Sequence, residues 1–163
     1  MSTTEFTQIA EFGKRLMGEN EIEKCLELIS EQAKVLVEAE RCSIFMVDAE
    51  SNMLWSKLSD GLGRIAIGLD SGIAGDTYKT QEAQIVNKPY QDERFMSKID
   101  AKSGFVTRNI LTIPIFNSKR EIIGVIQLLN KANGDFNEAD VDTLTFFANF
   151  ISGTLELAML KND

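Results

Sequence analysis

The chain has 163 residues, of which 44% are hydrophobic, and a formal net charge of −8. This length predicts one domain, and the deficit of lysine and arginine argues against an electrostatic grip on a nucleic-acid polymer. The sequence has no histidine, the commonest general base and metal ligand, and no apolar run near the roughly 20 residues that a membrane-spanning helix needs. Two cysteines and an N-terminus unlike a signal peptide predict a reduced, cytoplasmic protein.

We expect two helices within residues 1–39, followed by a core that spans 40–163. Apolar residues recur every three or four positions over 22–37, which is typical of a helix that buries one face. Gly18 and Asn20 interrupt the pattern and separate this helix from an earlier one.

The core predicts strands, short helices and a final long helix. Strands are expected from β-branched and aromatic content at 41–47, 53–58, 65–67, 85–86, 110–116 and 122–129. The last two form a hairpin. Helices are expected at 72–80, around 94–101 and at 137–160. This order predicts an α+β fold with a sheet whose N- and C-terminal helices lie on one face.

The last helix carries two apolar stripes. The first can pack on the sheet and consists of Leu144, Phe147, Ile151, Leu155 and Ala158. The second repeats in steps of four and three, as a coiled-coil seam does, and consists of Phe146, Phe150, Gly153, Leu157 and Leu160. A surface helix facing one core needs one stripe, so the second predicts another buried face. A homodimer seam is the favoured interpretation; the alternative is that the N-terminal helix covers this stripe within the monomer.

Nothing in the sequence indicates catalysis. Cys25 lies on the apolar face of a helix and Cys42 begins a strand, so both are expected to be buried structural thiols. A serine or cysteine nucleophile would lack a histidine partner, and no nucleophile-elbow motif occurs. Acidic residues are scattered without the spacing of a calcium loop. We therefore expect no enzyme, no metal and no cofactor.

The segment 70–75 (Asp-Ser-Gly-Ile-Ala-Gly) has the composition of a helix start flanked by glycines. The free N–H groups of such a start, together with the helix dipole, favour a bound anion such as a phosphate. The alternative is an ordinary capped turn, and on these six residues alone it is the favoured interpretation.

The end of the last strand has a distinctive order of residues. Asn130 and Lys131 end an apolar strand, Phe136 can fill the core, and Asp140 follows Asn137, a predicted helix N-cap. This order resembles the NKFDE signature of ligand-binding GAF domains, which include regulatory modules of cyclic-nucleotide phosphodiesterases and of some bacterial adenylate cyclases. Val141 stands where that signature has glutamate. We expect the four matching residues to brace the fold, with a Lys131–Asp140 ion pair joining the last strand to the last helix.

Further blocks between 41 and 127 are similar to the cyclic-nucleotide-binding GAF modules in the same order. The resemblance implies a GAF-like (PAS-like) antiparallel sheet on which the ligand lies beneath a lid of short helices. It implies that Ser43 and Asp60 contact the purine edge and that the backbone N–H groups of Ile73 and Ala74 face the cyclic phosphate. It places Met96, Asp100 and Ser103 on the lid. It places Thr107 and Gln127 near the ribose and the purine. Ser59, Met96 and Gln127 depart from the family pattern. Ser59 replaces an aromatic that stacks on the base, so binding would either be weaker or need a substitute ring.

The resemblance implies a regulatory sensor of cAMP or cGMP, with cAMP slightly favoured. Ligand would close region 89–107 over the pocket and act on the final helix and its dimer seam, with an output domain in a parent protein or in trans. The alternative is a GAF module for dimerisation or protein interaction, its pocket filled by side chains such as Met96 and Phe105. A methionine-sulfoxide reductase is a third and more distant possibility.

Overall fold

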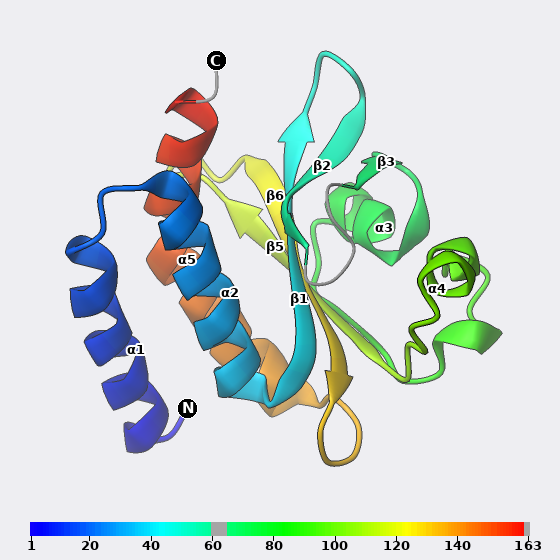
Figure 1. Cartoon of the computed structure of the whole chain (residues 1–163), viewed down its shortest axis with the longest axis horizontal. Coiled ribbons are helices and arrows are strands. Elements are labelled where there is room, and N and C mark those ends of the chain that lie inside the picture. Colours follow the sequence, from blue (N-terminus) through cyan, green and yellow to red (C-terminus); the bar gives the residue numbers. More distant parts are fainter. Residues whose placement is uncertain (60–64, 162–163) are drawn as a thin grey trace.

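The computed structural model describes residues 1–59 and 65–161, and within them six strands form one antiparallel sheet (Figure 1). Its order is β3-β2-β1-β6-β5-β4. The strands are β1 (Ala39–Asp48), β2 (Met53–Ser59), β3 (Ala66–Gly68), β4 (Gln84–Val86), β5 (Ile110–Phe116) and β6 (Ile122–Lys131). The two central strands β1 and β6 are the longest, with ten residues each, and each has a run of buried residues in its middle.

Three long helices cover one face of the sheet: α1 (Thr3–Met17), α2 (Ile22–Val37) and α5 (Glu138–Lys161) (Figure 1). The first stripe of α5 packs there, with Leu144, Phe147, Ile151 and Leu155 fully buried. They share one hydrophobic core with α2 and with the inner side chains of β1, β5 and β6. The predicted α+β fold is confirmed, and the side chain of Ala158 lies outside the description.

Shorter helices lie over the other face: α3 (Gly72–Thr80), the 3-10 turn η1 (Pro89–Gln91) and α4 (Ser97–Ser103) (Figure 1). The helix expected around 94–101 therefore begins three residues later. Arg94 is held in the preceding loop, where Asp92 Oδ1 accepts hydrogen bonds from the Arg94 backbone N–H and from Nε, both at 2.9 Å.

The second stripe of α5 is divided between two environments. Helix α1 lies against its first part: the Phe6 and Phe146 rings meet edge to face with centroids 5.4 Å apart. Gly13 leaves room for Phe150, since a Cβ there would lie 2.7 Å from Phe150 Cζ. Leu157 and Leu160 remain 48% and 67% exposed. Helix α1 thus contacts the beginning of the stripe but leaves Phe146 and Phe150 42% and 49% exposed, so the intramolecular alternative accounts for the stripe only in part.

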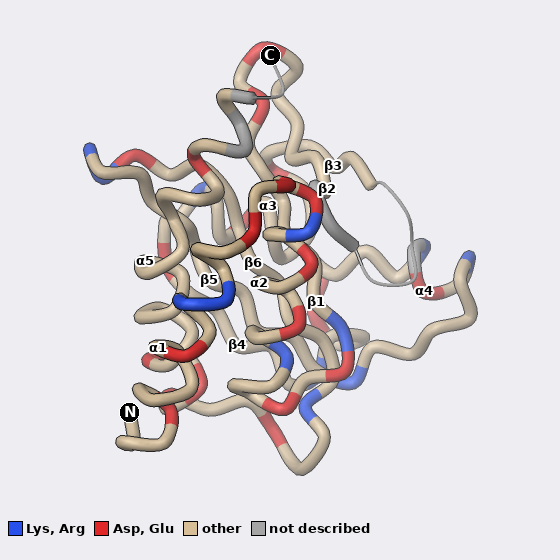
Figure 2. The backbone as a smooth tube through the Cα atoms, turned by 60° about the vertical axis from the view of Figure 1, so that its left-hand side comes forward, with Lys and Arg blue, Asp and Glu red and all other residues tan. Residues whose placement is uncertain are grey.

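Acidic residues outnumber basic ones in the chain, which has a net charge of −8, and several of them lie along α1, α2 and α5 (Figure 2). In the part of the chain that the structure describes, no helix combines the length and apolarity needed to cross a membrane.

Candidate functional site

A cavity lies between the sheet and the layer formed by α3 and α4. The volume of the cavity is about 60 Å³. Seven of the nine predicted ligand-binding residues line it: Ser43, Ile73, Ala74, Met96, Asp100, Thr107 and Gln127. The sequence therefore located this cavity, which is narrow in the present state.

The floor of the cavity comes from adjacent strands in register. Ser43 on β1 is paired with Gln127 on β6, and Gln127 is paired in turn with Thr112 on β5. Alternate residues of a strand point to the same face, which brings Phe45 into the lining beside Ser43. The Thr112 hydroxyl makes a buried 2.6 Å hydrogen bond with the hydroxyl of Thr77, so α3 is fixed to the sheet through its interior.

The start of α3 forms one wall. Gly72 has φ +69°, a left-handed conformation that glycine adopts without strain, and a Cβ there would lie 3.2 Å from Met96 Sδ. Ser71 is the N-cap residue, and its side chain makes no hydrogen bond to the first turn. The first turn, with Ile73 and Ala74, therefore faces the cavity as the glycine-flanked segment predicted.

The segment 89–107, which contains η1 and α4, forms the roof of the cavity. It is fastened near its C-terminal end by Asp100 on α4. The buried Asp100 carboxylate accepts hydrogen bonds from the Thr107 N–H at 2.8 Å, the Thr107 hydroxyl at 2.9 Å and the Tyr90 hydroxyl at 2.5 Å. The hydrogen bond to Asp100 raises the pKa of Tyr90, because the carboxylate stabilises the protonated phenol and repels the phenolate. Asp100 thus joins η1, α4 and the strand that follows.

The N-terminal end of the roof is held by the Arg94 guanidinium. Its Nη1 lies 2.6 Å from Asp76 Oδ2 on α3 and also bonds the Gln84 amide oxygen on β4, and its Nη2 lies 2.7 Å from Asp92 Oδ2. The hydrogen bond from the Gln84 amide lowers the pKa of Asp76, and the Arg94 guanidinium lowers it to a smaller extent. The hydrogen bond from Arg94 also lowers the pKa of Asp92. These partly exposed groups form the second attachment of the roof.

The other two predicted ligand contacts are Asp60 and Ser103. Asp60 lies outside the described residues, as does the side chain of Ser59. Ser103 is on α4 as expected, but its side chain is exposed, and its hydroxyl bonds the Asp100 carbonyl. Its role as a ligand contact remains a prediction, without support from the lining.

Sequence reasoning missed most of the apolar lining. Phe95, just before α4, lines the cavity and packs edge to face with Tyr90, with ring centroids 5.0 Å apart. The adjacent pair Phe95–Met96 within otherwise polar residues was the available signal. Phe45, Ile110 and Leu129 are on strands, where local sequence does not tell a cavity floor from a core.

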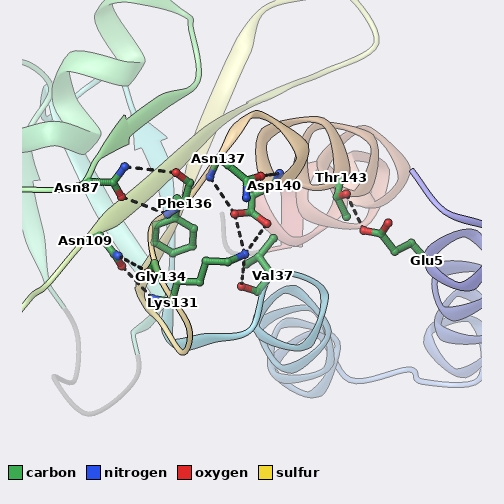
Figure 3. Close-up of polar contacts among 10 residues, drawn as sticks. All are labelled: Glu5, Val37, Asn87, Asn109, Lys131, Gly134, Phe136, Asn137, Asp140 and Thr143. Atoms are coloured by element: carbon green, nitrogen blue, oxygen red, sulfur yellow. Dashed lines mark hydrogen bonds and ion pairs between the residues drawn. The ribbon is translucent and has the colours of Figure 1, made fainter.

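The four signature residues brace the fold, and Figure 3 shows three of them, Lys131, Phe136 and Asp140. Lys131 Nζ lies 2.8 Å from both Asp140 carboxylate oxygens, which confirms the predicted ion pair, and 3.4 Å from the Val37 carbonyl oxygen at the end of α2. Asn137 caps α5: its Oδ1 accepts from the Asp140 N–H at 3.1 Å, and Asp140 Oδ2 accepts from the Asn137 N–H at 3.0 Å. Phe136 is buried in the core below them.

Asn130 connects the signature to the end of the roof. Its Oδ1 accepts a hydrogen bond from the Arg108 N–H at 2.6 Å, and its Nδ2 donates to the Val106 carbonyl at 2.9 Å. Asn130 has φ +62°, a left-handed conformation that asparagine tolerates better than most residues. The signature therefore lies outside the lining that the structure describes, but holds the residues on either side of Thr107.

These features define an α+β domain with a helical layer on one sheet face and a roofed cavity on the other. The model of the GAF domain family matches residues 21–155, which is most of the chain. The chain therefore belongs to the GAF domain family.

Similar proteins include cyclic-nucleotide phosphodiesterases. The chain is 31% identical over 171 residues to the dual 3′,5′-cyclic-AMP and -GMP phosphodiesterase 11 of Drosophila melanogaster, covering 93% of this chain and 12% of the relative. It is 34% identical over 143 residues to the dual 3′,5′-cyclic-AMP and -GMP phosphodiesterase 11A of Takifugu rubripes, covering 77% and 16%. The chain thus spans less than a fifth of these relatives.

Solved structures share the fold. The GAF domain of an Acinetobacter phosphoenolpyruvate-protein phosphotransferase has a TM-score of 0.83 and 20% identity over 99% of both chains. The free methionine-R-sulfoxide reductase of Neisseria meningitidis has a TM-score of 0.79 and 16% identity, covering 99% of this chain and 95% of that one. At these identities the likeness concerns the fold alone.

Proposed function

We propose that this domain is a regulatory sensor that binds a cyclic nucleotide, cAMP or cGMP, and does not hydrolyse it. The observation that carries the proposal is that seven residues chosen by resemblance surround one cavity. The similarity to phosphodiesterases that act on cyclic AMP and GMP supports the ligand class.

The parts of the cavity suit the parts of a cyclic nucleotide. The first turn of α3 offers backbone N–H groups to the phosphate, favoured by the helix dipole. Ser43 and Gln127 on the floor and Thr107 in the roof supply polar groups for the purine and the ribose. Phe95 and Phe105 in the roof are candidates for the ring that replaces the aromatic missing at Ser59. A ligand of this size needs more than the present free space, so binding must move the roof.

Calorimetry with cAMP and cGMP on the purified chain tests the proposal. Heat of binding, with a rise in melting temperature, is the expected result, because a ligand that binds only the folded state stabilises it. Neither heat nor a thermal shift at millimolar ligand would refute the sensor.

We expect Asp100→Ala and Thr107→Ala each to weaken binding about tenfold or more. Asp100 and Thr107 hold each other and the roof by charge-assisted hydrogen bonds, which contribute about 1.5–3 kcal/mol each. Titration calorimetry measures the change, with Asp135→Ala and Thr145→Ala as matched exposed controls that keep wild-type affinity. Unchanged affinity in both roof variants would contradict this assignment of the pocket.

We further propose that the second stripe of α5 forms a homodimer seam, supported by the exposure of Leu157 and Leu160. The double variant Phe150→Glu, Leu157→Glu is expected to sediment as a monomer and the wild type as a dimer, because buried glutamates at an apolar seam are strongly unfavourable. Thr145→Glu, which adds charge on another side of α5, is the control and should remain dimeric. A monomeric wild type would refute the seam.

A module that works by protein interaction without nucleotide is the second candidate. The narrowness of the cavity and the presence of Met96 and Phe105 in its lining favour this candidate. Absence of binding in calorimetry together with a dimeric wild type would support it. A cysteine-based reductase has less support, because Cys25 is buried on α2 and Cys42 packs in the core on the helical side of the sheet.

A further inference from the structure

Arg41 on β1 has an unsatisfied buried donor. Its Nη1 is shielded from solvent and has no hydrogen-bond partner among the residues that the structure describes. The guanidinium lies over the ring of Phe105, with Cζ 3.8 Å from the ring centroid, which is a cation–π contact. A buried guanidinium N–H without an acceptor is costly, so a native structure that keeps one calls for an explanation.

The sheet register places Arg41 at the end of the cavity floor. Arg41, Ser43 and Phe45 alternate along β1 and so share a face, and the last two line the cavity. The β6 residue paired with Arg41 is Leu129, which lines the cavity, as does Gln127 opposite Ser43. Arg41 is therefore the next position in the row that forms the floor, and Phe105 above it belongs to the cavity roof.

Neighbouring carboxylates are occupied by other donors. Glu40 points to the opposite side of the strand, where its Oε2 lies 3.7 Å from Arg108 Nη1 and accepts from Asn130 Nδ2 at 3.3 Å. Asp100 in the roof already accepts the three hydrogen bonds from Thr107 and Tyr90. The unsatisfied Nη1 hydrogen thus suits an acceptor that arrives with a ligand.

We propose that Arg41 is a specificity residue that selects a 6-oxopurine, as in cyclic GMP, over a 6-aminopurine, as in cyclic AMP; this rests on the proposed function. A guanidinium fork matches the O6 and N7 acceptors of guanine, whereas adenine presents its 6-amino donor at the same edge. Phe105 holds the guanidinium in place from above. Ser43, one pair further along β1, meets the same purine.

The test is a calorimetric panel on the whole chain with cyclic GMP, cyclic IMP, 7-deaza-cyclic GMP and cyclic AMP. We expect cyclic GMP and cyclic IMP to bind about tenfold or more tightly than cyclic AMP, the discrimination typical of a bidentate arginine–guanine contact. The 7-deaza analogue, which lacks the N7 acceptor, should bind more weakly than cyclic GMP. Arg41→Met, which keeps an unbranched side chain under Phe105, should bring the cyclic GMP to cyclic AMP ratio close to one.

Arg108→Met is the matched control, because Arg108 is exposed and pairs with Glu40 away from the cavity; it should keep the wild-type ratio. Thermal unfolding checks that both variants are folded. If Arg41→Met does not fold, the relative affinities of the wild type for the four ligands test the proposal. Tighter binding of cyclic AMP than of cyclic GMP, or an unchanged ratio in folded Arg41→Met, would overturn the role of Arg41 and leave the sensor intact. Failure of all four ligands to bind would overturn the sensor itself.

Discussion

Replacing Asp140 with asparagine is expected to lower the free energy of unfolding by about 3 kcal/mol. The Lys131 and Asp140 side chains are only 14% and 10% exposed, and removing one charge leaves the other poorly solvated and unpaired. Asparagine keeps the shape and an oxygen that can accept from Asn137, so the loss reports mainly the charge. Urea unfolding measures the effect.

An exposed ion pair provides the comparison. Lys24 and Glu21 on the surface of α2 are 57% and 68% exposed and 3.6 Å apart, so Glu21→Gln should change stability by less than about 0.5 kcal/mol. The double variant Lys131→Met, Asp140→Asn should recover part of the loss, because it no longer buries an unpaired ammonium. A folded Asp140→Asn protein as stable as wild type would show that the pair does not brace the domain.

Gly124→Ala is expected to destabilise the domain by about 3 kcal/mol or more. Gly124 faces Met46 in the central β1–β6 pair, and a Cβ on it would lie 2.4 Å from the Phe45 carbonyl oxygen and 2.9 Å from Met46 Sδ. The Met46 side chain can shift, but the Phe45 carbonyl is backbone, so the two longest strands would have to separate locally. Thermal and urea unfolding both measure the loss.

Gly18→Ala at the end of α1 is the matched control, because Gly18 has a right-handed helical backbone and a Cβ there would meet only the Arg15 carbonyl oxygen among the described residues, at an ordinary contact distance of 3.5 Å. Alanine is the better helix former, so this change should raise stability by up to about 1 kcal/mol. Equal effects of the two substitutions would mean that the tight β1–β6 contact at Gly124 can relax without cost.

The sequence predicted the elements with a strong local period. The apolar stripe over 22–37 is compatible with little but a helix, and the apolar runs of β1 and β6 with little but strands. The observed bounds of α2 and β6 agree with the expected bounds to within a few residues. The start of α4 was less predictable, because Arg94 is kept out of the helix by Asp76 and Asp92, and Asp76 is distant in sequence.

The candidate site was predictable in its residues more than in its shape. Family resemblance placed Ser43, Thr107 and Gln127 around the cavity, but no local pattern reveals how far a roof closes. How much of the second α5 stripe is covered depends on the contact between Phe6 of α1 and Phe146, which lie near opposite ends of the chain. Long-range contacts of this kind leave no periodic signal.

The hydrogen bonds of Asn130 make the roof mechanically asymmetric. At one end, Val106 and Arg108 are tied by their backbone to a buried side chain, and releasing them would strand buried polar groups at about 1–3 kcal/mol each. At the other end Arg94 holds on through partly exposed ion pairs, which salt screens and which are worth about 0–1 kcal/mol each. We therefore expect the roof to open at the Arg94 end before the Thr107 end, and to open more readily at high salt.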